Sequence, residues 1–179
     1  MLSAMTDPQY PIGKYEPQTR PDAATLVRWI DEIAAAPDTL RAAMRGLDDT
    51  QLDTPYRPGG WTLRQVAHHV PDSHLNAYQR FKLTLTEDLP LIKTYDEARW
   101  AELPDARTGS IEPSLALLER LHERWVRLLR AMTPADFARA FRHPEVGAPV
   151  TLARTAGLYA WHGRHHPAQV TTLRASRGW

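Results

Sequence analysis

The sequence predicts an all-α four-helix bundle, and three observations point to this fold. Four blocks carry apolar residues at spacings of three and four, the periodicity of a helix that buries one face. Strand signals are scarce, apart from a possible short extended piece around Phe141. The chain has 179 residues, of which 42% are hydrophobic, so we expect one compact domain over residues 1–179 with a sizeable core. Four amphipathic helices in one domain bury their apolar faces against one another.

The first helical block follows a proline-rich arm, residues 1–21. From Asp22 the pattern ATLVRWIDEIAAA is amphipathic, and Pro37 with the residue after it predicts a kink or break before TLRAAMRGL resumes the helix. The connection at 48–60 contains two prolines and a Gly-Gly pair, so we expect no long element there. The arm itself carries the apolar anchors Tyr10, Ile12 and Tyr15. These anchors predict that it lies over the bundle or reaches a partner subunit, rather than staying disordered.

The second block begins after Thr62, which stands where a helix N-cap is expected, and its periodicity continues to about Glu87. The segment that follows, up to Ile111, is predicted to be a long loop with one short helix around Asp96–Leu103. A loop of this length can cross one end of a bundle or cover a site.

The third block, EPSLALLERLHERWVRLLRAM, has Pro113 in a position that suits the first turn of a helix. Its apolar stripe consists of Leu115, Leu118, Leu121, Trp125 and Leu128. Thr151 can then cap a final helix that ends near Arg174.

Charge and composition exclude several classes of protein. The formal net charge is +1, from 22 basic and 21 acidic residues, so nothing indicates binding to nucleic acid or to an anionic membrane. The chain has no cysteine, which leaves histidine and carboxylate as its strong metal ligands. The first residues do not resemble a secretory leader, and no stretch approaches the roughly 18 apolar residues of a membrane span. We therefore expect a soluble cytoplasmic protein.

The stretch WHGRHHPAQV, residues 161–170, places three of the eight histidines close together on the predicted last helix. With roughly 100° per residue, His162 and His166 fall within the apolar arc of this helix, and His165 falls on its flank. The i,i+4 pair presents two imidazoles to one point, the spacing by which a helix binds a metal ion. Packing two desolvated imidazoles together costs free energy unless something bridges them. Gly163 leaves room beside the pair for another backbone or a substrate.

On the second helix, the same comparison of helical phase leaves the choice of a third ligand open. His68 faces away from the apolar arc, His69 lies on its flank, and His74 points more directly inward. His69 and His74 are therefore both candidates. His122 and His143 have no such context, and we expect them to be surface or loop residues.

Three motifs give the chain a family resemblance. YPIGKYEP at 10–17, PGGWTLRQVAHHVPDSHLNAYQRFKLTLTE at 58–87 and YAWHGRHHPAQV at 159–170 resemble the YfiT-like metal-dependent hydrolases of the DinB-like superfamily. The resemblance implies a bundle of up-down-down-up order, a homodimer, and one zinc or nickel ion held by three histidines. One of these ligands comes from the second helix and two come from the HxxxH of the last.

Carried over by position, the resemblance selects the ligands. The second-helix ligand precedes an aliphatic residue and, three positions on, an acid, which selects His69. The last ligand precedes the segment that ends in Gln169, which selects His166, and His162 follows from the spacing. Pro71 and Pro167 lie within two residues of these positions, so local kinks could change the ligand geometry.

The resemblance favours a thiol S-transferase that uses a low-molecular-weight thiol such as bacillithiol and acts on electrophilic small molecules. The alternatives are a metal-dependent hydrolase and a non-catalytic metal-binding stress-response bundle. Asp72, Asn76 and Arg80 recur every turn of the second helix, so they could bind the charged groups of the thiol or orient the ligands, or form a solvated face. We also expect Trp161 to be exposed opposite the site, which supports the homodimer.

Overall fold

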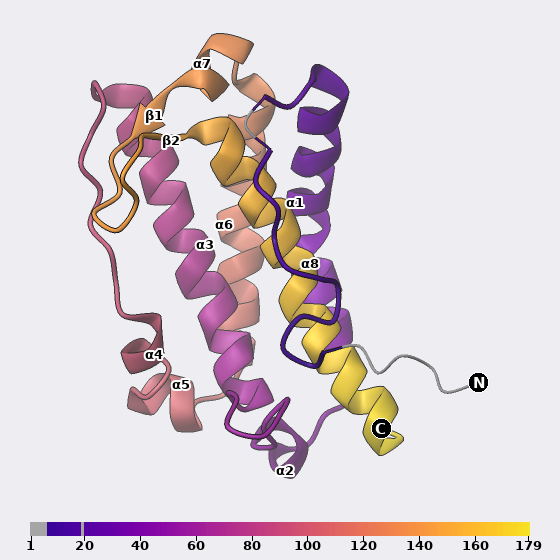
Figure 1. Cartoon of the computed structure of the whole chain (residues 1–179). Coiled ribbons are helices and arrows are strands. Elements are labelled where there is room, and N and C mark those ends of the chain that lie inside the picture. The colour runs from indigo at the N-terminus through magenta and orange to yellow at the C-terminus, as the bar shows by residue number, and fades with distance from the viewer. Residues whose placement is uncertain (1–6, 19) are drawn as a thin grey trace.

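The computed structural model describes residues 7–18 and 20–179, so residues 1–6 and 19 of the predicted arm lie outside the described residues. Its four long helices are α1 (Ala23–Met44), α3 (Leu63–Thr86), α6 (Glu112–Ala131) and α8 (Leu152–Arg177). In Figure 1, α1 and α8 run down the picture, whereas α3 and α6 run up it. This is the up-down-down-up order, and it confirms the predicted fold class.

The four helices close into a ring because each one packs on two others. α1 packs against α8 and α6, and α3 packs against the same two helices from the other side. Two clusters of buried apolar residues fill the interior. The α7-end cluster includes Ile33, Ala77, Phe81, Trp125, Tyr159 and Ala160. The α2-end cluster includes Leu40, Val66, Val70, Leu118, Val170 and Leu173.

A layer of histidines lies between the two apolar clusters. On α3 it includes His69 and His74, which lie on either side of Val70, and on α8 it falls between Ala160 and Val170. The middle of the bundle is therefore polar, although both ends of its core are apolar. Buried polar side chains must find partners to offset their lost hydration, so this layer is where a specific site is expected.

Side-chain caps begin three of the long helices, and those at Thr62 and Thr151 were predicted from the sequence. The side chain of Asp22 accepts a hydrogen bond from the Thr25 backbone N–H at the start of α1. Thr62 forms a reciprocal capping box with Gln65 at the start of α3, and Thr151 caps α8. Each cap satisfies a backbone N–H that has no partner within the helix.

Of the kink or break predicted at Pro37, the break is wrong, because α1 continues through this residue. Proline removes one intrahelical hydrogen bond, but the buried face of the helix runs on from Ile33 and Ala36 to Leu40. Packing of this face supports the helix across the proline. Pro71 and Pro167 likewise lie inside α3 and α8.

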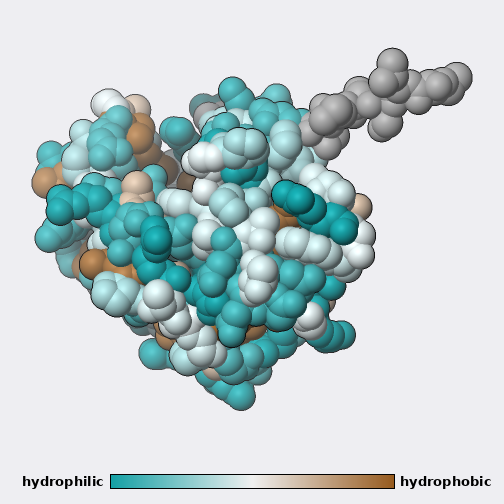
Figure 2. Space-filling view, turned by 90° about the horizontal axis from the view of Figure 1, so that it is seen from below, coloured by the Kyte–Doolittle hydropathy of each residue, from teal (hydrophilic) through white to brown (hydrophobic). Residues whose placement is uncertain are grey.

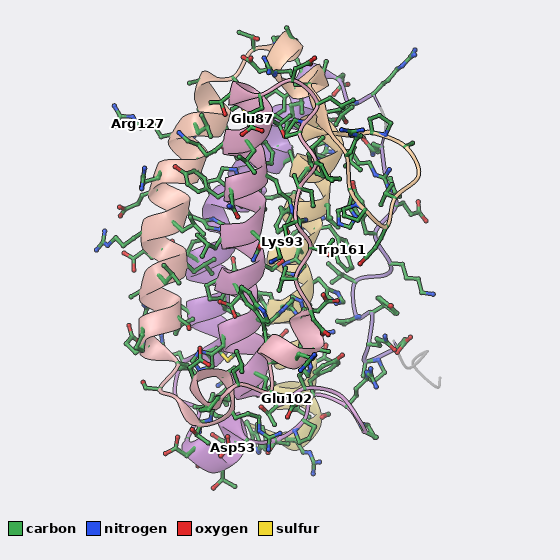
Figure 3. The ribbon with its side chains drawn as sticks, turned by 90° about the vertical axis from the view of Figure 1, so that its left-hand side faces the viewer. Asp53, Glu87, Lys93, Glu102, Arg127 and Trp161 are labelled. Atoms are coloured by element: carbon green, nitrogen blue, oxygen red, sulfur yellow. The ribbon has the colours of Figure 1, made fainter. Side chains whose placement is uncertain are left out.

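The connections contain short elements. The segment 48–60 holds only α2 (Asp49–Leu52). After α3 the chain forms α4 (Glu97–Trp100) and α5 (Pro104–Thr108), where we expected a single short helix. α7 (Pro134–Ala138) precedes β1 (Ala140–Phe141), which pairs antiparallel with β2 (Val150–Thr151) and confirms the extended piece. Figure 3 shows the connection after α3, marked by Lys93, descending over the side of the bundle formed by α3 and α8.

The described part of the N-terminal arm lies along α8 (Figure 1), in agreement with the expectation that the arm lies over the bundle. The Tyr15 hydroxyl donates to the Arg154 carbonyl (3.0 Å), and the Trp161 indole N–H donates to the Gly13 carbonyl (3.1 Å). In Figure 3, Trp161 lies on the side of α8 that faces the arm. The expectation of a freely exposed Trp161 is therefore wrong, because the arm covers it. The expected homodimer then rests on the family resemblance alone.

The end of the bundle that Figure 2 shows is mostly polar. Figure 2 views the end of the bundle that carries α2 and the end of α8, and hydrophobic residues appear there only in separate small areas. Among the described residues, no helix combines the length and the apolar character needed to cross a membrane.

Gly163 permits the close approach of another backbone, which is one of the two roles that we expected for it. A Cβ placed on Gly163 would lie 2.7 Å from the Cβ of Ala36 on α1. We expect Gly163→Val to lower the free energy of unfolding by about 1–3 kcal/mol, since the two helices must move apart. Urea unfolding measures this loss, with Arg164→Val as the control on the exposed neighbouring position. Equal losses in the two variants would show that helix propensity, rather than this contact, is responsible.

Candidate metal centre

The structure brings together the three histidines that the family resemblance selects. His69 lies on α3, and His162 and His166 lie one turn apart on α8. The Nε2 atom of His162 is 3.3 Å from that of His69 and 3.2 Å from that of His166. One ligand atom of each residue lies within 4.8 Å of the others. Two antiparallel helices thus direct three imidazoles to one point, in the manner of a three-nitrogen metal site.

Burial keeps these imidazoles uncharged at neutral pH. Desolvation, together with the nearby His165, lowers the pKa of His69 to about 4. Desolvation is also the main cause that lowers the pKa of His162 and of His166 well below the usual range, with neighbouring imidazoles adding to it. Only an uncharged imidazole has a free lone pair for a metal ion, so the three side chains are ready to bind one.

The donor set fits a divalent ion such as zinc or nickel. The Gln169 amide donates to the Gln9 carbonyl (3.0 Å), so the other end of this amide is an oxygen. That oxygen accepts a hydrogen bond from the Nδ1–H of His166 (2.8 Å). The Nε2 of neutral His166 therefore carries a bare lone pair, which faces the Nε2 of His162. A cation between these nitrogens would remove their repulsion.

Two further histidines of the same motifs lie outside this group. His68 faces away from the three-histidine group, but it is buried: its Nδ1 is 2.7 Å from the Ser114 hydroxyl. The segment from α5 to the start of α6 covers this face of α3, which helical phase cannot reveal. His165 is buried against the arm and stacks on Trp161, with 4.2 Å between the ring centroids.

The expectation that His122 lies on the surface is wrong, because its side chain is only 2% exposed. Its Nε2 is 2.8 Å from the Nδ1 of His74, and His74 in turn contacts His162. The signal was present in the sequence: His122 lies four residues after Leu118 and three before Trp125, within the buried stripe of α6. His143 lies in a loop, as expected, and is partly buried.

A polar cavity of about 330 Å³ opens beside the three-histidine group, and His69 and His162 form part of its wall. The long connection after α3 covers this cavity with Tyr95 and Glu97, which agrees with its predicted ability to cover a site. Tyr159 of α8 also lines it. A bound ion would therefore face a space large enough for a small molecule.

Of the three polar residues predicted on α3, only Arg80 lines this cavity. Its Nε atom is buried and has no hydrogen-bond partner in the part of the chain that the structure describes. Asp72 and Asn76 are not part of the cavity wall, and the Asn76 amide donates to the Asp72 backbone carbonyl (2.9 Å). Burial, together with the nearby Asp105, raises the pKa of Asp72 to about 6. Arg80 thus differs from the other two in facing the site.

The fold and the site together define a four-helix bundle protein with a three-histidine metal site beside a polar cavity. The family model of the DinB superfamily matches residues 32–170. The chain therefore belongs to the DinB superfamily, and within it to the YfiT-like proteins that the sequence motifs resemble.

Two relatives are similar over almost their whole length. A protein of Bacillus mycoides (strain KBAB4), named a "putative metal-dependent hydrolase", is 51% identical over 175 residues, which cover 98% of this chain and 100% of the relative. YfiT of Bacillus subtilis (strain 168), named in the same way, is 48% identical over 170 residues, covering 95% of this chain and 96% of the relative.

The solved structure of Bacillus subtilis YfiT superposes with a TM-score of 0.93, at 48% identity, over 96% of this chain and 98% of that one. It is described as a probable metal-dependent hydrolase with an unusual four-helix bundle topology. A second four-helix bundle protein matches with a TM-score of 0.57 at 24% identity, over 84% of this chain and 99% of that one. At this identity the second match shows the fold alone.

Proposed function

We propose that this protein is a metal-dependent hydrolase that acts on a small polar molecule. The observation that carries the proposal is the position of His69 and His162, which are members of the three-histidine group and also wall residues of the cavity. The three neutral imidazoles would hold a divalent ion, and such an ion would supply an acidified water as nucleophile near neutral pH. The relatives named as hydrolases support this reading over the thiol transfer that the motifs led us to expect.

Arg80 would bind an anionic group of the substrate. Its guanidinium faces the cavity, and no carboxylate of the described residues forms an ion pair with it. A cation without a partner in a polar cavity is suited to a carboxylate or phosphate ligand. The tyrosines of the cavity stay protonated at neutral pH, because burial raises the pKa of both Tyr95 and Tyr159. The Tyr159 hydroxyl already donates to the Ser73 carbonyl (3.1 Å), so of these two Tyr95 can donate a hydrogen bond to a substrate oxygen.

The test is turnover by full-length protein of measured zinc or nickel content. Carboxylate-bearing esters, amides and phosphoesters are incubated with the loaded protein and with the metal-stripped protein. We expect hydrolysis of at least one class, which disappears when the metal is removed. Full metal content with no turnover of any substrate would contradict the proposal and would favour a non-catalytic metal-binding bundle.

The second candidate is the thiol S-transferase. Two features of this chain favour it: the chain has no cysteine to serve as its own nucleophile, and the cavity contains both Arg80 and the carboxylates Glu97 and Glu145. A zwitterionic thiol such as bacillithiol carries groups that match both signs of charge. The assay separates the two candidates when bacillithiol and glutathione are added side by side. A product that forms only when a thiol is present, and that contains the thiol, would show that the reaction is thiol transfer and not hydrolysis.

Substitution of Arg80 checks its role in either reaction. We expect Arg80→Met to lower kcat/KM for an anionic substrate by about 10- to 100-fold, the effect of losing a charge-assisted hydrogen bond. Metal content should not change, since Arg80 is not one of the three histidine ligands. Arg127→Met is the matched control, because Arg127 projects from the outer face of α6 (Figure 3). An unchanged kcat/KM in Arg80→Met would remove Arg80 from the substrate site.

A further inference from the structure

A row of three histidines connects α1 to the metal site. The Nδ1 of His122 is 2.7 Å from the Ile33 carbonyl oxygen on α1. The Nε2 of His122 is 2.8 Å from the Nδ1 of His74, and the Nε2 of His74 is 3.0 Å from the Nδ1 of His162. The row therefore uses both nitrogens of His122 and of His74, and it leaves only the Nε2 of His162 for the metal site.

The Ile33 carbonyl, at the end of the histidine row that is far from the metal site, determines where each proton of the row lies. A carbonyl oxygen can only accept, so His122 carries its proton on Nδ1 and, as a neutral ring, has a bare Nε2. That nitrogen accepts from the Nδ1–H of His74, whose Nε2 is then bare in turn. His74 accepts from the Nδ1–H of His162. The same rule leaves the Nε2 of His162 without a proton.

We infer that His74 and His122 are positioning residues of the metal site, which hold His162 in the Nδ1–H tautomer with its Nε2 lone pair directed at the ion. A metal-binding histidine commonly donates its other N–H to a carboxylate, a carbonyl or water. Here two neutral histidines perform this task from α3 and α6. The inference rests on the three-histidine site of the proposed function and does not depend on which reaction the site catalyses.

The packing around the row holds the rings in place. His74 has no solvent exposure and His122 is 2% exposed. The two rings stack with 4.9 Å between their centroids. Trp125 and Tyr159 meet the His74 ring edge-on, at 5.8 and 5.0 Å between centroids. A flipped ring would break a buried hydrogen bond and leave its partners unsatisfied.

His166 reaches the same tautomer by a separate route, through Gln169 and the Gln9 carbonyl of the arm. Both α8 ligands therefore have a bare Nε2, and these atoms lie 3.2 Å apart with no proton to share. One hydrogen-bonded row ends on the backbone of α1 and the other on the arm. The cation-binding character of the site thus depends on residues outside the three ligands.

The first experiment measures tautomers in metal-free, full-length protein at pH 7.5 by long-range ¹H–¹⁵N correlation of the imidazole rings. We expect His74, His122 and His162 all to carry the proton on Nδ1, although free neutral histidine favours the proton on Nε2. A proton on the Nε2 of His162 or His74 would overturn the inference. Since the protein is metal-free, the result does not depend on catalysis.

The second experiment compares the dissociation constants of zinc for two substitutions of similar size. His74→Leu removes the acceptor for His162, and we expect it to weaken zinc binding by about 10- to 100-fold. His74→Gln keeps an acceptor oxygen in reach. We expect its zinc affinity to stay within about threefold of that of the parent protein, a much smaller change than in His74→Leu. A purely structural role would reverse this order, because leucine suits an apolar interior better than glutamine does. Equal affinity in the two folded variants would overturn the inference, and if His74→Leu does not fold, the tautomers of the parent protein decide alone.

Discussion

Replacing His166 with alanine is expected to remove most of the bound metal from the purified protein, whereas His68→Ala should leave the metal content nearly unchanged. His166 contributes one of the three converging nitrogens. The side chain of His68 points to Ser114 and the Gly109 carbonyl instead. Loss of one ligand of three removes a large part of the binding free energy, while loss of a buried histidine elsewhere affects only stability. Elemental analysis of both variants after dialysis measures the difference.

The same measurement tests the ligand from α3. His69→Ala should lose its metal as His166→Ala does, and catalytic turnover should fall with it. The matched comparison is again His68→Ala, which removes the adjacent histidine of the same helix. If His69→Ala kept its full metal content while His68→Ala lost it, the assignment on α3 would be wrong.

Helical phase identified the pair on α8 because both residues lie on the buried face of one helix, a property of local sequence. It could not separate His69 from His74, and the structure shows why. Both residues contact His162: His69 contacts the Nε2 of His162, and His74 contacts the Nδ1 of His162. A position on the helix surface does not distinguish a metal ligand from a residue that supports one. Only the family motif selected His69.

The remaining parts of the site depend on contacts between distant segments. Ile33 and His122 are 89 residues apart in sequence, and Gln9 and Gln169 are 160 apart. No local pattern reports such pairs. The burial of His122 was accessible from its spacing on α6, but its partner was not. The continuity of α1 through Pro37 also follows from tertiary packing, which outweighs a local preference.

The metal-free protein is expected to unfold cooperatively as the pH falls from about 6.5 towards 4. Burial lowers the pKa of His69, His122 and His165 to about 4, and lowers that of His74, His162 and His166 well below the usual range. In the unfolded chain these groups titrate near about 6.5. Between the two values the unfolded state binds more protons, so acid favours unfolding by up to about 1.4 kcal/mol per pH unit for each histidine.

Asp72 acts in the opposite direction. Its pKa is about 6 in the folded protein, raised from 3.8, so the folded state binds an additional proton in this range and offsets about one of the histidines. Since a domain has about 5–15 kcal/mol of stability, the remaining histidines are sufficient to exhaust it within about two pH units. Far-ultraviolet circular dichroism against pH gives the midpoint, and the steepness of the transition gives the number of protons taken up. We expect a midpoint above pH 4 with an uptake of several protons, and zinc should shift this midpoint to lower pH because it binds only the folded site. A transition below pH 4, or one with the slope of a single proton, would show that the histidine layer is not neutral and buried as the structure describes.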